Sequence, residues 1–412
     1  MAQLTDDCFA FGGRLMPLDD ALALIAAVRP VTGTEPVSVT EADRRVLADD
    51  VVARVSLPPF ANSAVDGYAV RHGSADVLPI DGRTPAGVPA APLRPGTARR
   101  ILTGAPLPDG ADTVFMQEDV RIVDGQVHLP PGLARGANTR PAGEDVLAGT
   151  LALPAGRRLR PQDLSLAAAL GLATLVVRRR VRVALLSTGD ELVDPSPAPH
   201  AAPHAVLETA QRYDSNRVLI TAMLARAGAI VTDLGIIPDR PDAIDEALQA
   251  GAGHDLILTT GGVSAGEEDH VRAAVERLGR LTFWRLAIKP GRPVALGQIG
   301  DTVFLGLPGN PAAAFVTFTI LACPLLAALA GTAPDPAWPV SAVAAFSYRK
   351  KAGRREYVRV RLVQGPEGLL AHRHPVEGAG ILTSLTETDG LAMLGEACTA
   401  VAPGDRLLVR VH

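Results

Sequence analysis

The chain has 412 residues, a formal net charge of −4 and 47% hydrophobic residues. This length exceeds one ordinary core, so three or four domains are expected, and the charge gives no reason to expect nucleic acid or an anionic membrane as a partner. Its three cysteines, Cys8, Cys323 and Cys398, match no zinc or redox spacing and favour a reduced, cytoplasmic compartment. The N-terminus, MAQLTDDCFAFGG, lacks the basic and apolar regions of a secretory signal.

The N-terminal segment is patterned as a helical scaffold. Residues 16–28 carry apolar side chains at helical spacing, and residues 40–47 offer a second short helix with Thr40 as its cap. Helical patterning returns later in the chain, around a proline-initiated apolar stretch. We therefore predict a discontinuous helical scaffold domain made of residues 1–50 and 147–180.

Residues 51–146 carry short alternating runs separated by Pro, Gly and Asp, which predicts a β-rich domain inserted into the scaffold. Three polar loops interrupt these runs. FANSAVDGYAV contains Asp66 before Gly67, a pair that could close an ordinary turn or reach toward a ligand. TGAPLPDGAD begins at Thr103, and NTRPAGEDV contains Asp145.

In residues 181–332, strand-like and helix-like stretches alternate, which predicts a parallel α/β sheet with helices on both faces. The predicted strands are 181–187, 230–236 and 255–260, and the predicted helices are 215–227, 241–250 and 269–279.

Glycine loops follow three strand ends in this domain: STGDEL, TTGGVSAGEED and LPGNP. A single Gly-Gly is more often an ordinary turn, but parallel strands place all three loops at one sheet edge, where phosphates bind. Asn310 and Pro311 are a natural N-cap and first helical residue, so free N–H groups of the next helix should face this edge. The substrate-binding candidates in these loops are Thr188, Gly261, Gly262, Ser264, Pro308, Gly309, Asn310 and Pro311.

Charged residues gather in the sequence around these loops. Acids beside a phosphate site commonly serve a bridging Mg²⁺, because a hard cation takes oxygen ligands from both sides. Each charged residue alone could be a solvated loop position, so the argument rests on their shared placement at one edge. The acids are Glu191, Asp239 and Asp269, and the cations, all in FWRLAIKPGRP, are Arg285, Lys289 and Arg292.

Residues 312–330 carry no charge and approach the length needed to span a bilayer. Thr317, Thr319 and Pro324 interrupt the segment, and no basic cluster flanks it, so a buried helix is predicted instead of a membrane span.

Strand-like runs in residues 333–412 predict a small C-terminal β-domain or barrel. A basic cluster near its start, predicted in a hairpin turn, could be a solvated tip or an arm of the anion site. Its members are Arg349, Lys350, Lys351, Arg354 and Arg355.

Taken in order, the motifs resemble the bacterial MoeA family of molybdopterin molybdenumtransferases, whose relatives include the gephyrin E domain. The resemblance covers nearly all 412 residues. It implies a four-domain homodimer with its cleft completed between subunits. The motifs are NSAVDGYAV, TGAPLPDGADTV, GEDV, STGDEL, YDSN, TTGGVSAGEED, FWRLAIKPGRP, LPGNPAAAF and GAGILTSL.

The resemblance also implies a reaction, the Mg²⁺-dependent insertion of molybdate into adenylylated molybdopterin with release of AMP. The implied catalytic residues are Asp66, Asp145, Glu191, Asp239 and Asp269, of which Glu191 and Asp269 match the family's Mg²⁺ ligands. Lys289, Arg292 and Arg355 match its molybdate-binding cations, and Arg285 and Thr103 belong to the implied substrate site.

The sequence departs from the family pattern at two positions. Arg285 stands where bacterial members often have Lys, and Ala379 replaces the usual Ser of GSG, which puts a hydroxyl contact to molybdate in doubt. Two alternatives therefore stay open: a non-catalytic molybdopterin-binding scaffold of the same fold, and a molybdopterin adenylyltransferase. Protein contacts with such an adenylyltransferase or with molybdoenzymes are expected for a family member, and the sequence does not separate molybdate from tungstate.

Overall fold

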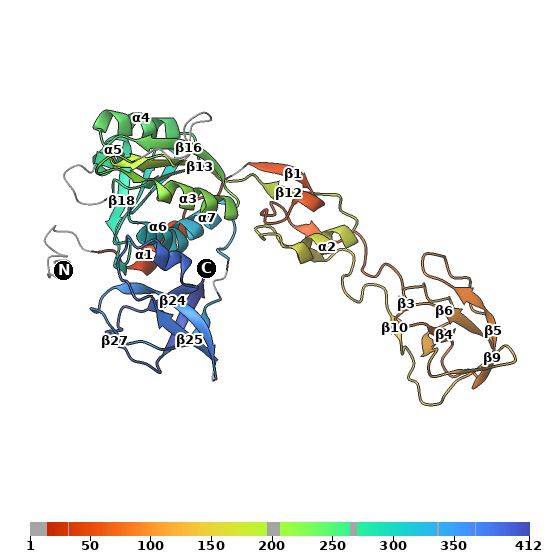
Figure 1. Ribbon diagram of the computed structural model, residues 1–412. Helices are drawn as coiled ribbons and strands as arrows, with labels where there is room; N and C mark the ends of the chain where they lie inside the picture. Colours follow the sequence, from red (N-terminus) through yellow and green to blue (C-terminus); the bar gives the residue numbers. More distant parts are fainter. Residues whose placement is uncertain (1–14, 32, 196–206, 264–269, 336–337, 367) are drawn as a thin grey trace. The chain divides into compact units, whose positions relative to one another are not determined.

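The computed structural model describes residues 15–31, 33–195, 207–263, 270–335, 338–366 and 368–412. They form two compact units (Figure 1). Unit 1 comprises Met1–Thr34 and Arg178–His412, and unit 2 comprises Glu35–Val177.

In the described part of unit 1, six strands form a sheet in the order β16-β13-β17-β21-β20-β18. The first four are parallel, as predicted, and the last two add an antiparallel edge. The strands are β13 (Arg182–Thr188), β16 (Ile230–Ile237), β17 (Leu256–Thr260), β18 (Gly279–Arg285), β20 (Pro293–Ile299) and β21 (Thr302–Leu307).

Helices cover both faces of this sheet (Figure 1). Alternate residues of β13 separate the two cores: Val183 and Leu185 pack with α1 and α3, whereas Ala184 and Leu186 pack with α4 and α5. The prediction of helices on both faces is confirmed. These helices are α1 (Leu18–Ala26), α3 (Ser215–Arg226), α4 (Pro241–Gly251) and α5 (His270–Leu278).

The apolar segment after β21 is one long helix, Pro311–Leu329, in which α6 (Pro311–Thr317) and α7 (Cys323–Leu329) are joined by a π-helical turn at Phe318–Ala322. It is long and apolar enough to cross a membrane, yet 78% of its most apolar stretch is buried inside the protein. The hydroxyls of Thr317 and Thr319 donate to main-chain carbonyls of the same helix. They are therefore satisfied without water, and the prediction of a buried helix is confirmed.

The N-terminal helix α1 differs from its predicted grouping. Leu18, Ala21 and Ile25 belong to the same core as Val183 and Leu185 of the sheet. The helix therefore packs in unit 1, whereas the sequence grouped it with residues 147–180.

The scaffold part of unit 2 is less helical than predicted. The predicted helix at residues 40–47 is wrong: a single 3-10 turn, Val39–Glu41, is capped by Ser38. At Arg44 the backbone is left-handed (φ 60°), and the chain then pairs with the stretch around Leu159, so helix cannot continue. Along the whole of unit 2, α2 (Pro161–Ala169) is the one α-helix.

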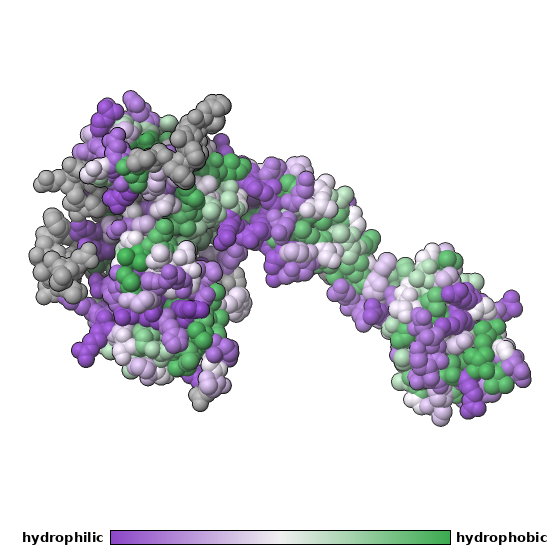
Figure 2. All heavy atoms as spheres, viewed as in Figure 1, coloured by the Kyte–Doolittle hydropathy of each residue, from purple (hydrophilic) through white to green (hydrophobic). Residues whose placement is uncertain are grey.

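Short strand pairs complete the scaffold: β1 (Thr34–Ser38) with β12 (Thr174–Arg178), and β2 (Val51–Val52) with β11 (Leu151–Leu153). Figure 2 shows hydrophobic residues on the surface of this part of unit 2, which carries α2. Exposed apolar side chains here are those of Val52, Leu147, Leu151 and Val176.

The rest of unit 2 is β-rich, as predicted, with a sheet in the order β7-β4-β6-β5-β9-β8 and a separate pair, β3 with β10. The strands are β3 (Asn62–Ser63), β4 (Gly67–Val70), β5 (Val77–Thr84), β6 (Ala98–Ile101), β7 (Thr113–Met116), β8 (Arg121–Val123), β9 (Gln126–His128) and β10 (Thr139–Arg140).

The C-terminal part of unit 1 is a β-barrel, because the strand order β24-β25-β22-β28-β26 closes when β26 pairs back with β24. The barrel strands are β22 (Val340–Ala344), β24 (Arg355–Gly365), β25 (Gly368–Arg373), β26 (Gly390–Leu394) and β28 (Arg406–Val411). Smaller elements are β14 (Leu192–Val193), β15 (Arg212–Tyr213), β19 (Ile288–Lys289), β23 (Tyr348–Arg349), β27 (Ala400–Val401) and α8 (Thr383–Thr386).

Candidate functional site

A cavity of about 630 Å³ lies in unit 1 where β13, β17 and β21 end. The three predicted glycine loops all contribute to its wall. The predicted residues that line it are Thr188, Glu191, Asp239, Gly261, Gly262, Pro308, Gly309, Asn310 and Pro311. Ser264 and Asp269 lie outside the described residues.

Two neighbouring glycines fix the shape of the cavity wall. Gly261 has φ +92°, and a Cβ there would lie 2.6 Å from the carbonyl oxygen of Thr188. Gly262 has φ +63°, and a Cβ there would lie 2.6 Å from Thr188 Oγ1. Only glycine combines the left-handed backbone with this close approach, so the loop presents main chain and not side chains to a ligand.

The start of α6 matches the prediction in part. Asn310 is the N-cap and Pro311 follows it, although the Asn310 side chain makes no capping hydrogen bond. The prediction of free N–H groups at this helix start is wrong for Ala312, because its N–H donates to the carbonyl oxygen of Ala379 at 2.9 Å. The residue that departs from the family pattern therefore touches the helix start through its backbone.

The carboxylates of the cavity repel one another. Glu191 pairs with Arg212 at 2.8 Å, and the Asp239 N–H donates to Asp190 Oδ1 at 3.0 Å. Burial raises the pKa of Asp239, and the negative charges of Asp190 and Glu191 raise it further. Across the described residues, no group of three or more His, Cys, Asp or Glu side chains is placed to hold a metal ion.

Lys289 lies on β19, which pairs with barrel strand β24. Its Nζ donates to the Tyr348 hydroxyl at 3.1 Å and lies 3.6 Å from Glu356 Oε2. Tyr348 donates in turn to the fully buried Glu356, and burial together with this bond raises the pKa of Tyr348. Lys289 is therefore held by an internal acid.

Arg355 is held in the same way, by Asp19 at 3.2 Å and Glu396 at 2.9 Å. Lys350, from the same basic cluster, donates to two main-chain carbonyls at the barrel end. Lys350 and Arg355 are thus bonded within unit 1, whereas Arg349 and Lys351 of the same cluster are exposed. The predicted cations that do not line the cavity are Arg285, Lys289, Arg292 and Arg355.

The three polar residues predicted in the inserted domain belong to unit 2. Asp66 Oδ1 accepts hydrogen bonds from both the N–H and the hydroxyl of Thr103, each at 2.8 Å. These bonds lower the pKa of Asp66, so its carboxylate stays charged. Asp145 donates its N–H to the Leu57 carbonyl oxygen at 2.9 Å.

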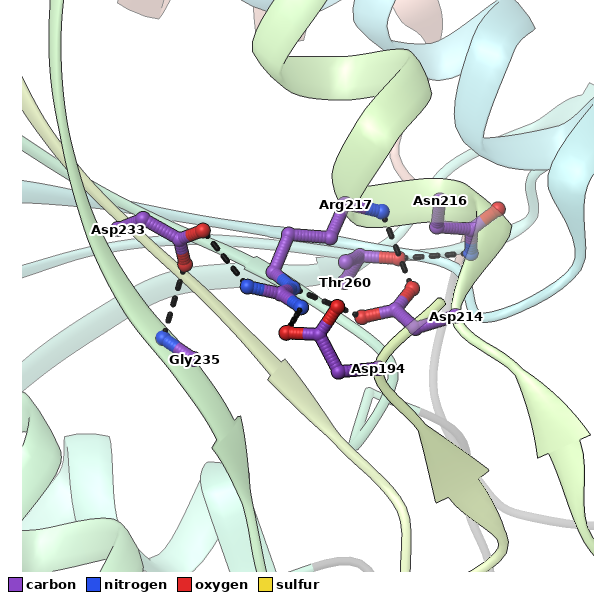
Figure 3. Close-up of polar contacts among 7 residues, drawn as sticks. All are labelled: Asp194, Asp214, Asn216, Arg217, Asp233, Gly235 and Thr260. Carbon is purple, nitrogen blue, oxygen red and sulfur yellow. Dashed lines mark hydrogen bonds and ion pairs between the residues drawn. The ribbon is translucent and has the colours of Figure 1, made fainter. Parts of the chain in front are cut away.

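Sequence reasoning predicted a helix at residues 215–227, and α3 begins at Ser215 as predicted, but it did not name the start of this helix as part of the site, which it lines. Asp214 caps this helix by accepting from the Arg217 N–H at 3.0 Å, and Arg217 in turn bonds Asp194, Asp214 and Asp233 (Figure 3). Three carboxylates therefore fix one guanidinium, and of these residues Asp214 lines the cavity. The motif YDSN, which contains Asp214 and Asn216, is the signal that could have added this turn to the site.

Asn216 in the same turn is 7% exposed and bonds two of the glycine loops. Its Nδ2 donates to Thr260 Oγ1 and to the Gly309 carbonyl oxygen, both at 2.8 Å (Figure 3 shows the Thr260 bond).

Glycine loops around a cavity at the carboxyl edge of a parallel sheet place the chain among α/β proteins whose ligand sites lie at that edge. Three family models match the chain: MoeA N-terminal region (domain I and II) over residues 16–171, probable molybdopterin binding domain over 184–328, and MoeA C-terminal region (domain IV) over 341–411.

Among curated relatives, the molybdopterin molybdenumtransferase of Haemophilus influenzae is 38% identical, with 84% of this chain and 85% of the relative covered. Molybdopterin molybdenumtransferase 2 of Mycobacterium tuberculosis is 37% identical, covering 94% and 96%. The crystal structure of a molybdopterin biosynthesis MoeA protein from Pyrococcus horikoshii OT3 aligns with TM-score 0.81 at 27% identity, covering 97% and 100%. The chain belongs to the MoeA family and is an enzyme of molybdenum cofactor biosynthesis.

Proposed function

We propose that the cavity binds adenylylated molybdopterin and that the enzyme inserts molybdate into it, with release of AMP. The observation that carries this proposal is the Gly261–Gly262 wall, where the backbone closes against Thr188 and leaves no room for a Cβ. The start of the 311–329 helix lines the cavity, and its dipole favours a phosphate there because it is fixed before the ligand arrives.

Mg²⁺ fits the donor set in this cavity. Glu191 and Asp239 both line it, and Mg²⁺ is commonly held by one or two carboxylates together with substrate phosphates. Burial and the negative charges of Asp190 and Glu191 raise the pKa of Asp239, and a bound cation would stabilise its ionised form. When bound, the ion would neutralise charge on the phosphates, and Asp269 remains the further acid proposed to hold it.

Molybdate is proposed to bind at Lys289, Arg292 and Arg355, with Arg285 nearby in sequence. Lys289 and Arg355 lie on the paired strands β19 and β24. Both already have acidic partners, so an arriving oxyanion has to exchange with carboxylates. Binding by side-chain charge of this kind depends on salt more strongly than binding by main-chain dipoles.

Asp66, Thr103 and Asp145 are kept as candidate catalytic or substrate-contacting residues of the inserted domain. The short bonds from Thr103 to Asp66 support this assignment, because they keep a charged carboxylate oriented at an exposed position. Single substitutions of each, assayed for AMP release, test the assignment.

The enzyme is further proposed to be a cytoplasmic homodimer. Exposed apolar side chains at Val52, Leu151 and Val176 support association of two copies, because burying such side chains against a second copy lowers the free energy. Contacts with a molybdopterin adenylyltransferase or with molybdoenzymes belong to the same proposal. Light scattering of the purified protein tests the dimer, and a monomer with full activity would contradict it.

The reaction is tested by incubating purified protein with adenylylated molybdopterin, Mg²⁺ and either molybdate or tungstate. AMP release that depends on the oxyanion supports the proposal. The oxyanion that gives the faster release identifies the metal, molybdenum or tungsten, that the enzyme inserts. Ala379 favours one alternative, a scaffold that binds molybdopterin without turnover. Binding of molybdopterin with no AMP release under any of these conditions would establish that alternative.

A further inference from the structure

Asn216 carries a polar atom that the protein leaves without a partner. The residue is 7% exposed and lines the cavity. Both hydrogens of its amide are used, one by Thr260 Oγ1 and one by the Gly309 carbonyl oxygen. Its Oδ1 is buried, and no described atom donates a hydrogen bond to it.

The orientation of this amide is fixed by its partners. A carbonyl oxygen can only accept, so the nitrogen of Asn216 has to face Gly309, and Oδ1 has to point elsewhere. Figure 3 shows Nδ2 turned toward Thr260, with Oδ1 on the opposite side of the amide. A buried acceptor held in this way is unfavourable until a donor reaches it.

We propose that Asn216 is a ligand-binding residue whose Oδ1 accepts a hydrogen bond from an N–H or O–H group of the bound pterin substrate. Through its two N–H donors, Asn216 also joins the loop at Gly309 to the strand end at Thr260. The same side chain would therefore contact the ligand and fix the spacing between the two loops. A fully deprotonated phosphate oxygen cannot donate to Oδ1. Asn216 therefore selects a part of the substrate that carries a donor, whereas the glycine loops take the phosphate. The inference rests on the proposed assignment of the cavity to molybdopterin.

The test is an anaerobic fluorescence titration of the full-length protein with molybdopterin. Asn216→Ala should weaken binding about tenfold to a hundredfold, since a buried hydrogen bond to the ligand is lost. Gln249→Ala, which removes an amide from an exposed position on α4, is the matched control and should bind as the parent protein does. Wild-type affinity in Asn216→Ala, even with a lower melting temperature, would overturn the inference, because it would make the residue purely structural.

A second variant keeps the test decisive if Asn216→Ala does not fold. Asn216→Asp retains an acceptor oxygen but cannot donate to the Gly309 carbonyl unless its carboxyl is protonated. Its affinity relative to the parent protein at the same pH should therefore be low at neutral pH and recover in part as the pH falls. A ratio that does not change with pH would contradict the proposed role of the two donors.

Gly261→Val separates this inference from the proposed function. If Gly261→Val abolishes molybdopterin binding while Asn216→Ala preserves it, the cavity assignment stands and the role of Asn216 is wrong. If both variants bind as the parent protein does, the cavity assignment itself is wrong.

Discussion

The glycine cavity and the cationic strand pair β19–β24 are the two proposed anion sites, and they are built in different ways. In the cavity, the main chain at Gly261 and Gly262 packs closely against Thr188, so the backbone that faces a ligand is held in place by the fold. On the strand pair, Lys289 and Arg355 are side-chain charges already engaged by Glu356, Asp19 and Glu396.

The difference has a physical consequence. A backbone site is ready before the ligand arrives and changes little when a nearby charge is removed. At a side-chain site with internal acid partners, a bound oxyanion has to compete with the protein's own carboxylates for the same guanidinium. Substitutions should therefore affect the two regions by different mechanisms and to different extents.

The largest effect is expected from Gly261→Val. Valine is strained at φ +92°, and its Cβ would meet the Thr188 carbonyl oxygen at 2.6 Å. Molybdopterin affinity should fall by about a hundredfold or more, measured by fluorescence titration. A variant at another left-handed glycine with open space around it, Gly253→Val, should retain affinity. Comparable losses in both would show that general strain, and not the cavity wall, is responsible.

Arg355→Gln should act on molybdate more than on the pterin. Losing one charge-assisted contact costs about 1.5–3 kcal/mol, so the molybdate concentration at half-maximal rate should rise roughly tenfold or more. Molybdopterin affinity, measured without molybdate, should stay nearly unchanged. Equal losses of both ligands would mean that the two regions do not divide the work in this way.

Glu396→Gln sharpens the comparison from the other side. It removes one of the carboxylates that hold Arg355, which leaves the guanidinium more available to an oxyanion. The molybdate requirement should fall about twofold to fivefold, as expected for a partly exposed ion pair worth up to about 1 kcal/mol. An increased requirement would show that Glu396 positions Arg355 instead of competing for it.

The smallest effect concerns stability at the carboxylate edge. Because burial, Asp190 and Glu191 raise the pKa of Asp239, its ionised form costs stability at neutral pH, and that cost vanishes as the pH falls and the carboxyl is protonated. Asp239→Asn should therefore melt about 1–2 °C above the parent protein at pH 7, with no difference in mild acid. The same variant should lose AMP release. If Asp239→Asn melted below the parent protein at pH 7, the ionised Asp239 carboxylate would not be destabilising, and the prediction would be wrong.

The sequence alone predicted the parallel strands, their glycine loops, the helices on both faces and a buried helix at residues 312–330. The reason is that burial on one or both faces leaves a period in the sequence, and glycine marks the positions where a side chain cannot fit. It did not predict which core α1 joins, because an apolar stripe such as Leu18, Ala21 and Ile25 fits any core.

Tertiary structure also decided the contacts made over long distances in the chain. The helix predicted at residues 40–47 does not form, since that stretch pairs with residues more than a hundred positions later. The Ala312 N–H is taken by Ala379 of another part of unit 1. Asn216 reaches Thr260 and Gly309, which lie 44 and 93 residues further along the chain. Local pattern carries no information about such partners, because they meet only when separate elements pack together.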